Sequence, residues 1–188
     1  MSLQPNTRPK PCAQCGTLFS PFSSTARLCS PTCARKIVKA DQKAEKVQTR
    51  ARKAELETIP QLIKKAQHAF NAFIRGRDAR NPCISCGAPP PDLSALHAGR
   101  DAGHYRSVGS ASHLRFDERN CHAQCVHCNQ WKSGNAVDYR LGLLDRIGAA
   151  AVASLESDNT PHKWTREELR EIRATYIAKL KHIQRETR

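Results

Sequence analysis

Three features are scarce in this 188-residue sequence: aromatic side chains, acidic side chains and long apolar runs. Aromatic residues make up 5% and hydrophobic residues 39% of the chain, which excludes one large apolar core and predicts that bound metal helps to stabilise the fold. No apolar run approaches the roughly 20 residues that span a bilayer, and the first five residues contain no apolar signal segment. We therefore expect a cytosolic protein without a membrane partner.

The shortage of acidic residues leaves a large positive charge. The chain contains 31 Lys and Arg against 17 Asp and Glu, a formal net charge of +14, and the basic residues are spread along nearly its whole length. The charge stays strongly positive even if two zinc ions are bound by eight thiolates. This balance predicts a polyanionic partner, and nucleic acid fits better than a membrane surface.

Eight of the nine cysteines fall into two sets with the spacing of zinc ligands. The N-terminal set is Cys12, Cys15, Cys29 and Cys33, and the central set is Cys83, Cys86, Cys125 and Cys128. Paired cysteines of this kind present four thiolates to one tetrahedral Zn²⁺, and in a cytosolic protein they predict metal rather than disulfides. Cys121 is either a small buried residue or, with Cys125 and Cys128, part of an alternative ligand set. The N-terminal finger either grips DNA or only stabilises its own segment.

Composition and periodicity predict helices on both sides of the central cysteines. Residues 34–57 are rich in Ala, Lys, Arg, Glu and Gln, without Gly or Pro, and their thin apolar stripe favours a solvated basic helix over a coiled coil. A more amphipathic helix follows Pro60. Near the C-terminus, periodic apolar residues predict a helix over 139–155, and a T-x-x-E capping box at Thr165 and Glu168 begins the last helix.

The segment between the two central CxxC pairs carries the polar residues of a candidate site. Asp101, His104 and Asn120 follow one another there, and Asn129 directly follows the last cysteine. We expect short antiparallel strands at 104–108 and 113–116, then a helical segment after the second pair, while 87–103 reads as loop. Strand, strand and helix around a metal is the ββα-metal arrangement, and the residue order is that of an HNH (His-Me finger) site with its final His replaced by Asn.

The same residues carry a resemblance to a known family. Asp101 to Arg106, Leu114 to Phe116, Asn120 to Asn129 and Ser133 to Asn135 resemble the lambdoid phage NinG family, also called Rap, and the similarity extends over most of the chain. The resemblance implies a structure-specific recombination endonuclease that cuts branched DNA, including Holliday junctions and displacement loops, in the cytoplasm of the bacterial host cell.

Phosphodiester hydrolysis needs a base for water, a cation on the leaving oxygen and a scaffold that fixes both. Neutral imidazole takes a proton near physiological pH, so we assign His104 as the general base. Asp101 and Asn129 offer the oxygen ligands that Mg²⁺ or Mn²⁺ accepts. Asn120 is expected to hold the loop between the strands through bonds to the backbone. His122 is either a catalytic residue, as a second metal ligand or a transition-state contact, or a surface histidine.

One departure from the HNH pattern concerns the acidic residue. Related sites place it immediately before the histidine, whereas Gly103 stands there and Asp101 lies three residues upstream of His104. Asp101 therefore either ligates the cation through a bent loop or caps a turn. The expected phosphate contacts are Arg106, Arg115, Arg119 and Lys132.

Together these patterns predict a small zinc-stabilised α+β protein with four parts. They are a four-cysteine zinc finger (1–33), a basic helical linker (34–58), an HNH-like nuclease domain with a four-cysteine zinc site (59–137) and a C-terminal helical region (138–188). Two opposed cuts in a four-way junction favour a homodimer at the moment of action. The alternative function is a non-catalytic double zinc-finger protein that binds nucleic acid or serves as a scaffold.

Overall fold

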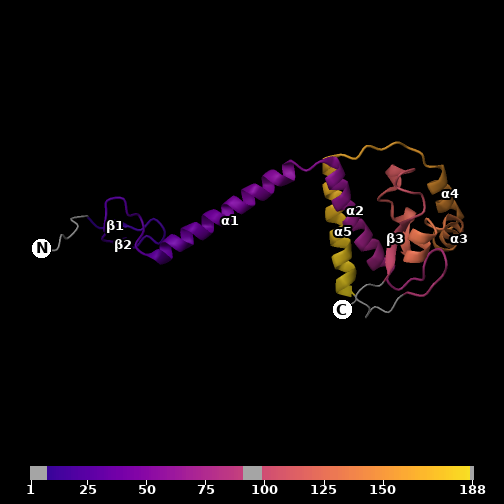
Figure 1. Cartoon of the computed structure of the whole chain (residues 1–188), viewed down its shortest axis with the longest axis horizontal. Helices are drawn as coiled ribbons and strands as arrows, with labels where there is room; N and C mark the ends of the chain where they lie inside the picture. The colour runs from indigo at the N-terminus through magenta and orange to yellow at the C-terminus, as the bar shows by residue number, and fades with distance from the viewer. Residues whose placement is uncertain (1–7, 91–98, 187–188) are drawn as a thin grey trace. The chain divides into compact units, whose positions relative to one another are not determined.

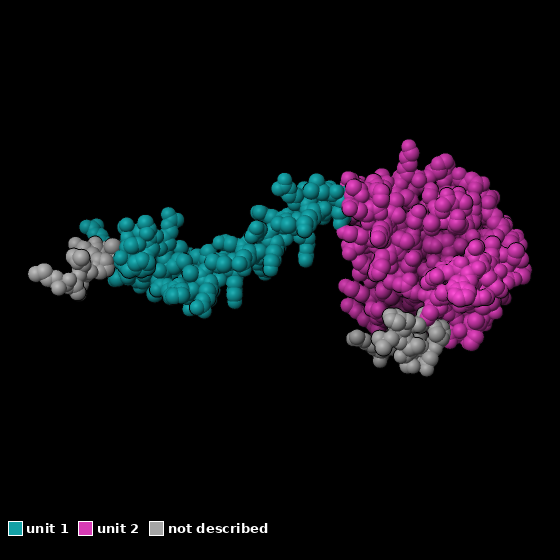
Figure 2. All heavy atoms as spheres, in the orientation of Figure 1, with its two compact units in different colours: residues 1–57 teal, residues 58–188 magenta. Residues whose placement is uncertain are grey.

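The chain divides into two compact units, Met1–Glu57 and Thr58–Arg188, which Figure 2 shows in different colours. The computed structural model describes residues 8–90 and 99–186, and it contains both helices and strands. Within those residues, every helix is too short or too polar to cross a membrane.

The N-terminal unit consists of a small hairpin followed by one long helix. Strand β1 (Lys10–Pro11) pairs antiparallel with β2 (Leu18–Phe19), and helix α1 spans Pro31–Glu55. The hydroxyl of Ser30 caps α1 by accepting a hydrogen bond from the Cys33 backbone N–H at 3.3 Å. Because α1 begins at Pro31, the last cysteine of the N-terminal set lies inside the basic helix rather than before it.

Two long helices lie side by side in the second unit (Figure 1). Helix α2 (Ile59–Arg77) and helix α5 (Arg166–Glu186) both begin at a capping box, and the Thr165 N–H donates to the Glu168 carboxylate at 2.8 Å. Their facing sides bury aromatic rings, with the centroids of Phe70 and Tyr176 4.8 Å apart. The apolar seam of the last helix thus packs against α2 of the same chain.

The hairpin beside these helices is built from other residues than the sequence predicted. Strand β3 (Arg100–His104) pairs antiparallel with β4 (Cys121–Cys125), so the expected strands at 104–108 and 113–116 are wrong. Residues 105–120 form a long loop with two 3-10 turns, η1 (Ser112–Leu114) and η2 (Glu118–Asn120).

The loop expected at 87–103 differs from the structure at its end, because Arg100 to Gly103 already belong to β3. Its middle part, 91–98, lies outside the described residues.

Three helical segments follow β4. They are the π-helical turn η3 (His127–Trp131), helix α3 (Ala136–Ile147) and helix α4 (Ala149–Ser157). The helical segment predicted over 139–155 is present but divided in two, because Gly148 adopts φ +81° and separates α3 from α4. A second glycine allows close packing: a Cβ at Gly142 would lie 1.9 Å from the carbonyl oxygen of Ile84, so only glycine lets α3 pass the first central CxxC pair.

A buried tyrosine joins α3 to the hairpin. The Tyr139 hydroxyl donates to the carbonyl of Gly103 at 2.7 Å and accepts from the backbone N–H of His122 at 2.9 Å. Both strands are thereby fixed to one helix, which sets the position of the polar residues on the hairpin.

Candidate functional site

The central cysteine set converges on one point. The sulfur atoms of Cys83, Cys86, Cys125 and Cys128 all lie within 4.8 Å of one another. A tetrahedral site with Zn–S bonds of about 2.3 Å has sulfur-to-sulfur edges of about 3.8 Å, and the Cys86 and Cys125 sulfurs are 3.8 Å apart. This spacing fits a zinc ion and is far too long for a disulfide.

Backbone donors in this cluster favour the thiolate at Cys83, whereas burial raises the pKa of Cys125 and raises that of Cys128 to about 12. The Cys125 N–H donates to the Cys83 sulfur at 3.3 Å, and the Cys128 N–H donates to the Cys125 sulfur at 3.4 Å. Burial raises the pKa of Cys83, but backbone hydrogen bonds from Cys86 and Cys125 outweigh it and lower the pKa to about 7. Such donors orient thiolates around a metal and offset their charge.

The N-terminal set forms an equivalent cluster within its own unit. Its four sulfurs lie within 4.8 Å of one another, and the Cys29 sulfur is 3.6 Å from both the Cys15 and the Cys33 sulfur. The Cys29 N–H donates to the Cys12 sulfur at 3.4 Å. The prediction of two cysteine clusters able to hold zinc is therefore confirmed in the geometry of the ligands.

Cys121 lies apart from both clusters. Its side chain is fully buried among apolar residues that include Phe70 of α2, and its sulfur is 3.7 Å from Nδ1 of His104. Burial raises the pKa of the Cys121 thiol, which therefore stays protonated at neutral pH. Of the two roles considered for Cys121, the structure places it as a buried thiol.

His104 ends strand β3 and has a defined tautomer. Its Nε2 lies 2.9 Å from the carbonyl oxygen of Arg115. A carbonyl only accepts, so Nε2 carries the proton and Nδ1 of the neutral ring carries the lone pair. Burial lowers the pKa of His104, which keeps the imidazole neutral near pH 7. A neutral ring fixed at Nε2 has the protonation state of a general base, although its Nδ1 faces the buried Cys121 thiol at 3.7 Å.

The loop that supplies the Arg115 carbonyl is held by Asn120. The fully buried Asn120 amide accepts from the Arg106 N–H at 2.8 Å and donates to the carbonyls of Arg106 at 3.0 Å and Leu114 at 3.2 Å. These are the backbone bonds expected of this residue. They also explain the missing strands, because a side chain takes the backbone groups that a neighbouring strand would have bonded.

Asp101 and Asn129 lie together. The Asn129 amide donates to the Asp101 carboxylate at 2.8 Å, and so does the amide of Gln130, also at 2.8 Å. A Cβ at Gly103 would lie 2.2 Å from the Gln124 amide oxygen and 3.2 Å from that of Asn129. The position directly before His104 therefore has no room for a carboxylate, so the acid stands further upstream.

The structure does not bring His104 together with Asp101 and Asn129. Side chains alternate along a strand, so Ala102 and His104 point to one face of β3 while Asp101 and Gly103 point to the other. Ala102 packs against the core beside α2, whereas Asn129 lies over Gly103. The candidate base and the candidate cation ligands thus occupy opposite faces of the hairpin.

His122 belongs to a third group. It is 4% exposed, and its Nδ1 lies 3.0 Å from an Arg77 nitrogen and 3.6 Å from the carboxylate of Asp78. Asp78 is 3% exposed, pairs with Arg77 at 2.8 Å and accepts from the Ala123 backbone N–H at 2.9 Å. This network joins the end of α2 to β4, so His122 is buried structure rather than a surface histidine.

The four basic residues expected at DNA differ in their surroundings. The Arg106 guanidinium donates to the carbonyls of Leu155 and Asp158, and Arg115 donates to Gln67 at 3.2 Å. Arg119 is half exposed and pairs with Asp117 at 2.7 Å. Lys132, three residues after Asn129 in the sequence, is exposed. Arg119 and Lys132 are therefore the more accessible of the four.

Sequence reasoning missed an exposed aromatic residue next to these polar groups. Trp131 closes the turn η3 that carries Asn129, and it is 78% exposed. An exposed indole in a basic protein can stack on a nucleobase. The sequence does contain an indication of this exposure, because Trp131 lies in a polar run with no apolar neighbours. The run is Asn129, Gln130, Trp131 and Lys132.

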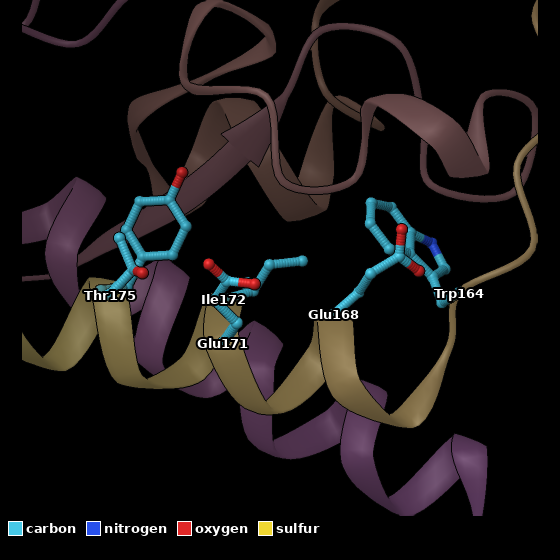
Figure 3. Close-up of a pocket in the computed structure, with 6 residues that line it drawn as sticks. Trp164, Glu168, Glu171, Ile172 and Thr175 are labelled. Atoms are coloured by element: carbon cyan, nitrogen blue, oxygen red, sulfur yellow. The ribbon is translucent and has the colours of Figure 1, made fainter.

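A pocket lies along α5. It is lined by Trp164, Glu168, Glu171, Ile172, Thr175 and Tyr176 (Figure 3). None of the predicted site residues contributes to it, and its two carboxylates do not suit a polyanion.

Buried charge around Asp78 leads to a stability prediction. Burial raises the pKa of Asp78, but bonds with His122 and Arg77 outweigh it and hold the pKa well below its usual value. A depressed carboxyl pKa contributes stability that is complete above the unfolded pKa of about 3.9 and is lost below it. Asp78→Asn should therefore lower the free energy of unfolding by about 3 kcal/mol. This difference should stay constant between pH 8 and about pH 5, because the carboxyl group is ionised throughout that range in both the folded and the unfolded chain.

Urea unfolding of the zinc-loaded protein at each pH measures this difference. Glu167→Gln, at a carboxylate that is 80% exposed, is the matched control and should change the free energy of unfolding little. A difference that already shrinks between pH 8 and pH 5 would contradict a depressed pKa for Asp78.

These features define a class: a small protein of mixed helices and strands with two cysteine clusters able to hold metal and a polar hairpin between the central cysteines. The chain belongs to the NinG family, since the family described as Bacteriophage Lambda NinG protein matches residues 4–186. It is 45% identical to protein ninG of Salmonella phage P22 over 190 residues, which cover 91% of both chains.

Two further relatives are similarly close. Protein ninG of Escherichia phage lambda is 43% identical over 190 residues, 91% of this chain and 90% of that protein. Protein ninG of Escherichia phage 933W is 43% identical over 192 residues, 92% of both chains. No solved structure matches this chain. Membership of the family confirms the resemblance seen in the sequence.

Proposed function

We propose that this protein is a metal-dependent, structure-specific DNA endonuclease of the HNH (His-Me finger) class that cuts branched recombination intermediates such as Holliday junctions and displacement loops. The observation that carries the proposal is the state of His104: a neutral ring whose Nε2 donates to the Arg115 carbonyl and whose Nδ1 has the lone pair. Branched DNA as the substrate rests on the family resemblance, and the formal charge of +14 suits it.

In this proposal His104 removes a proton from water at Nδ1, once the Cys121 thiol that lies 3.7 Å from this nitrogen has turned away. The hydrogen bond at Nε2 stabilises the imidazolium that results, because the carbonyl oxygen faces the ring N–H. Asn120 acts through the loop, since its three hydrogen bonds fix the backbone at Arg106 and at Leu114, the residue before Arg115. Asn120 is therefore a positioning residue rather than one that touches DNA.

Asp101 and Asn129 are the residues that would hold Mg²⁺ or Mn²⁺. A carboxylate and an amide oxygen suit such an ion, and their side chains are already in contact at 2.8 Å. The bound ion would supply stabilisation of charge on the phosphate and leaving oxygen. The amide of Asn129 would have to turn its oxygen toward the ion.

Substrate must then reach both faces of β3. His104 is the last residue of the strand. A single phosphate would therefore contact both His104 and Asp101 only at this end of the hairpin, where the chain leaves the strand. Lys132 and Arg119 are accessible for neighbouring phosphates, and Trp131 for an unpaired base.

A second candidate is a non-catalytic double zinc-finger protein that binds nucleic acid or organises a complex. The observation that favours it is the placement of His104 and the Asp101 pair on opposite faces of the hairpin. A binding function accounts for the cysteine clusters and the charge. It does not require His104, Asp101 and Asn129 to act on the same phosphate.

Cleavage of a synthetic four-way junction separates the two functions. The zinc-loaded protein should cut the junction when Mg²⁺ is added and leave it intact when Mg²⁺ is omitted, while a linear duplex of the same sequence is cut much less. Omission is preferable to a chelator, which would also remove zinc. Binding without cleavage at any Mg²⁺ or Mn²⁺ concentration would favour the second candidate.

The cation ligands can be tested by their effect on metal dependence. Asp101→Asn and Asn129→Ala should each raise the Mg²⁺ concentration needed for half-maximal cleavage by about tenfold or more, because each weakens an oxygen ligand set. Gln130→Ala is the control, since Gln130 also bonds Asp101 but leaves both ligands in place. A lower maximal rate with unchanged Mg²⁺ dependence would argue against these ligands.

A further inference from the structure

Helix α1 carries an uninterrupted heptad seam of small and branched residues. Reading Ile37 as position a, the a and d positions along the helix are occupied in steps of three and four residues. They are Ile37, Ala40, Ala44, Val47, Ala51 and Ala54. A strict repeat of this kind is the pattern of a coiled-coil interface, and four alanines allow two helices to approach closely.

The flanking positions carry charge in a definite order. All three g positions are basic, namely Lys36, Lys43 and Arg50, and the e positions are Asp41, Gln48 and Glu55. In a parallel pair each g residue faces the e residue five places later on the other helix. The pairs are then Lys36 with Asp41, Lys43 with Gln48, and Arg50 with Glu55, without a like-charge contact.

An antiparallel pair would have the opposite balance. There g positions face g positions and e positions face e positions, so three basic residues oppose basic residues and two acids oppose acids. Charge therefore selects the parallel arrangement.

The length of α1 also favours a partner. Residues 38 to 55 are all exposed in the single chain. Helices in proteins gain most of their stability from packing one face, and an exposed helix held by local bonds alone is marginal. Pairing would bury the seam, while the outward lysines at the c positions, Lys39, Lys46 and Lys53, would remain accessible to polyanions.

We propose that α1 is a homodimerisation helix, which forms a parallel two-stranded coiled coil with α1 of a second copy of this chain. The sequence analysis favoured a solvated basic helix, and this proposal takes the coiled-coil alternative because the seam also includes the alanines at positions 40 and 54. The proposal does not depend on nuclease activity. If the endonuclease function also holds, the dimer supplies two nuclease units for two opposed cuts.

Sedimentation equilibrium of the zinc-loaded, nucleic-acid-free full chain tests the seam. Salt of about 0.15 M screens the repulsion between two highly basic chains but leaves close pairs effective. The mass should rise from monomer to dimer with concentration. Ala44→Lys with Ala51→Lys, which places charge in the seam, should raise the dissociation constant by more than about tenfold.

Gln42→Lys with Thr49→Lys is the matched control, because it adds the same charge to the same helix at the outward f positions. The control should dimerise nearly as the natural chain does. A natural chain that stays monomeric at all concentrations, or a seam variant that dimerises as well as the control, would overturn the proposal.

The orientation has its own test. Changing Lys36, Lys43 and Arg50 to Glu sets acid against acid in a parallel pair and should abolish the dimer, whereas an antiparallel pair would only exchange one like-charge row for another. Adding Asp41→Lys and Glu55→Lys to that variant should restore the dimer. Dimers that survive the first change would overturn the parallel arrangement.

Discussion

Replacement of Cys83 by Ser is expected to unfold the central part of the chain. The Cys83 sulfur is one of four that lie within 4.8 Å of one another, and it accepts the Cys125 backbone N–H that begins the second CxxC turn. A structural zinc site contributes on the order of 10 kcal/mol to folding, which is about the whole stability of a domain of this size. Losing one ligand of four therefore threatens the fold itself.

Elemental analysis and circular dichroism measure this outcome. The natural chain should carry two Zn²⁺, one for each cluster, and Cys83→Ser should retain only the N-terminal ion and lose helical signal from the second unit. Cys121→Ser is the matched control, because it removes the same atom from a buried cysteine outside both clusters and should cost about 1–3 kcal/mol. Equal loss of zinc in both variants would mean that Cys121 is a ligand.

The cysteine clusters could be predicted from the sequence because their chemistry is local. Two ligands separated by two residues form one tight turn, so spacing alone indicates a shared ion. The same holds for the helix starts, where Thr165 and Glu168 meet within a single turn. Which of the CxxC turns share one metal ion depends on long-range contacts, and only the structure shows those.

The hairpin could not be predicted in the same way. Residues 113–116 have a short alternating pattern, but a pattern does not specify a partner strand. Here β3 pairs with β4, sixteen residues beyond its end, and the buried amide of Asn120 binds the loop backbone between them. When a side chain, rather than a neighbouring strand, forms the hydrogen bonds to the backbone, the hydrophobic pattern of the sequence does not indicate it.

The arrangement of the candidate site depends on that pairing. Asp101 and His104 are three positions apart, an odd number, so one regular strand places their side chains on opposite faces. In the expected fold Asp101 lay in a loop before the strand and was free to bend toward His104. The Arg77, Asp78 and His122 network was missed for a similar reason, since its members lie about 45 positions apart.

His104→Ala is expected to reduce cleavage of a four-way junction by about 10²- to 10⁴-fold, the usual cost of removing a positioned general base. Zinc content and junction binding should stay close to those of the natural chain, because His104 lies outside both cysteine clusters. Because burial lowers the pKa of His104, the cleavage rate of the natural chain should fall only when the pH drops below the ordinary histidine value of about 6.5.

A second variant separates catalysis from structure at this position. His104→Gln keeps an amide N–H that can donate to the Arg115 carbonyl but has no basic nitrogen, so it should preserve the loop and still fail to cleave. His182→Ala, at a histidine on α5 that is 73% exposed, should cleave normally. If Gln restores cleavage, His104 only holds the loop. If both His104 variants cleave at the natural rate, the HNH assignment is wrong, and a non-catalytic nucleic-acid-binding protein becomes the better account of this fold.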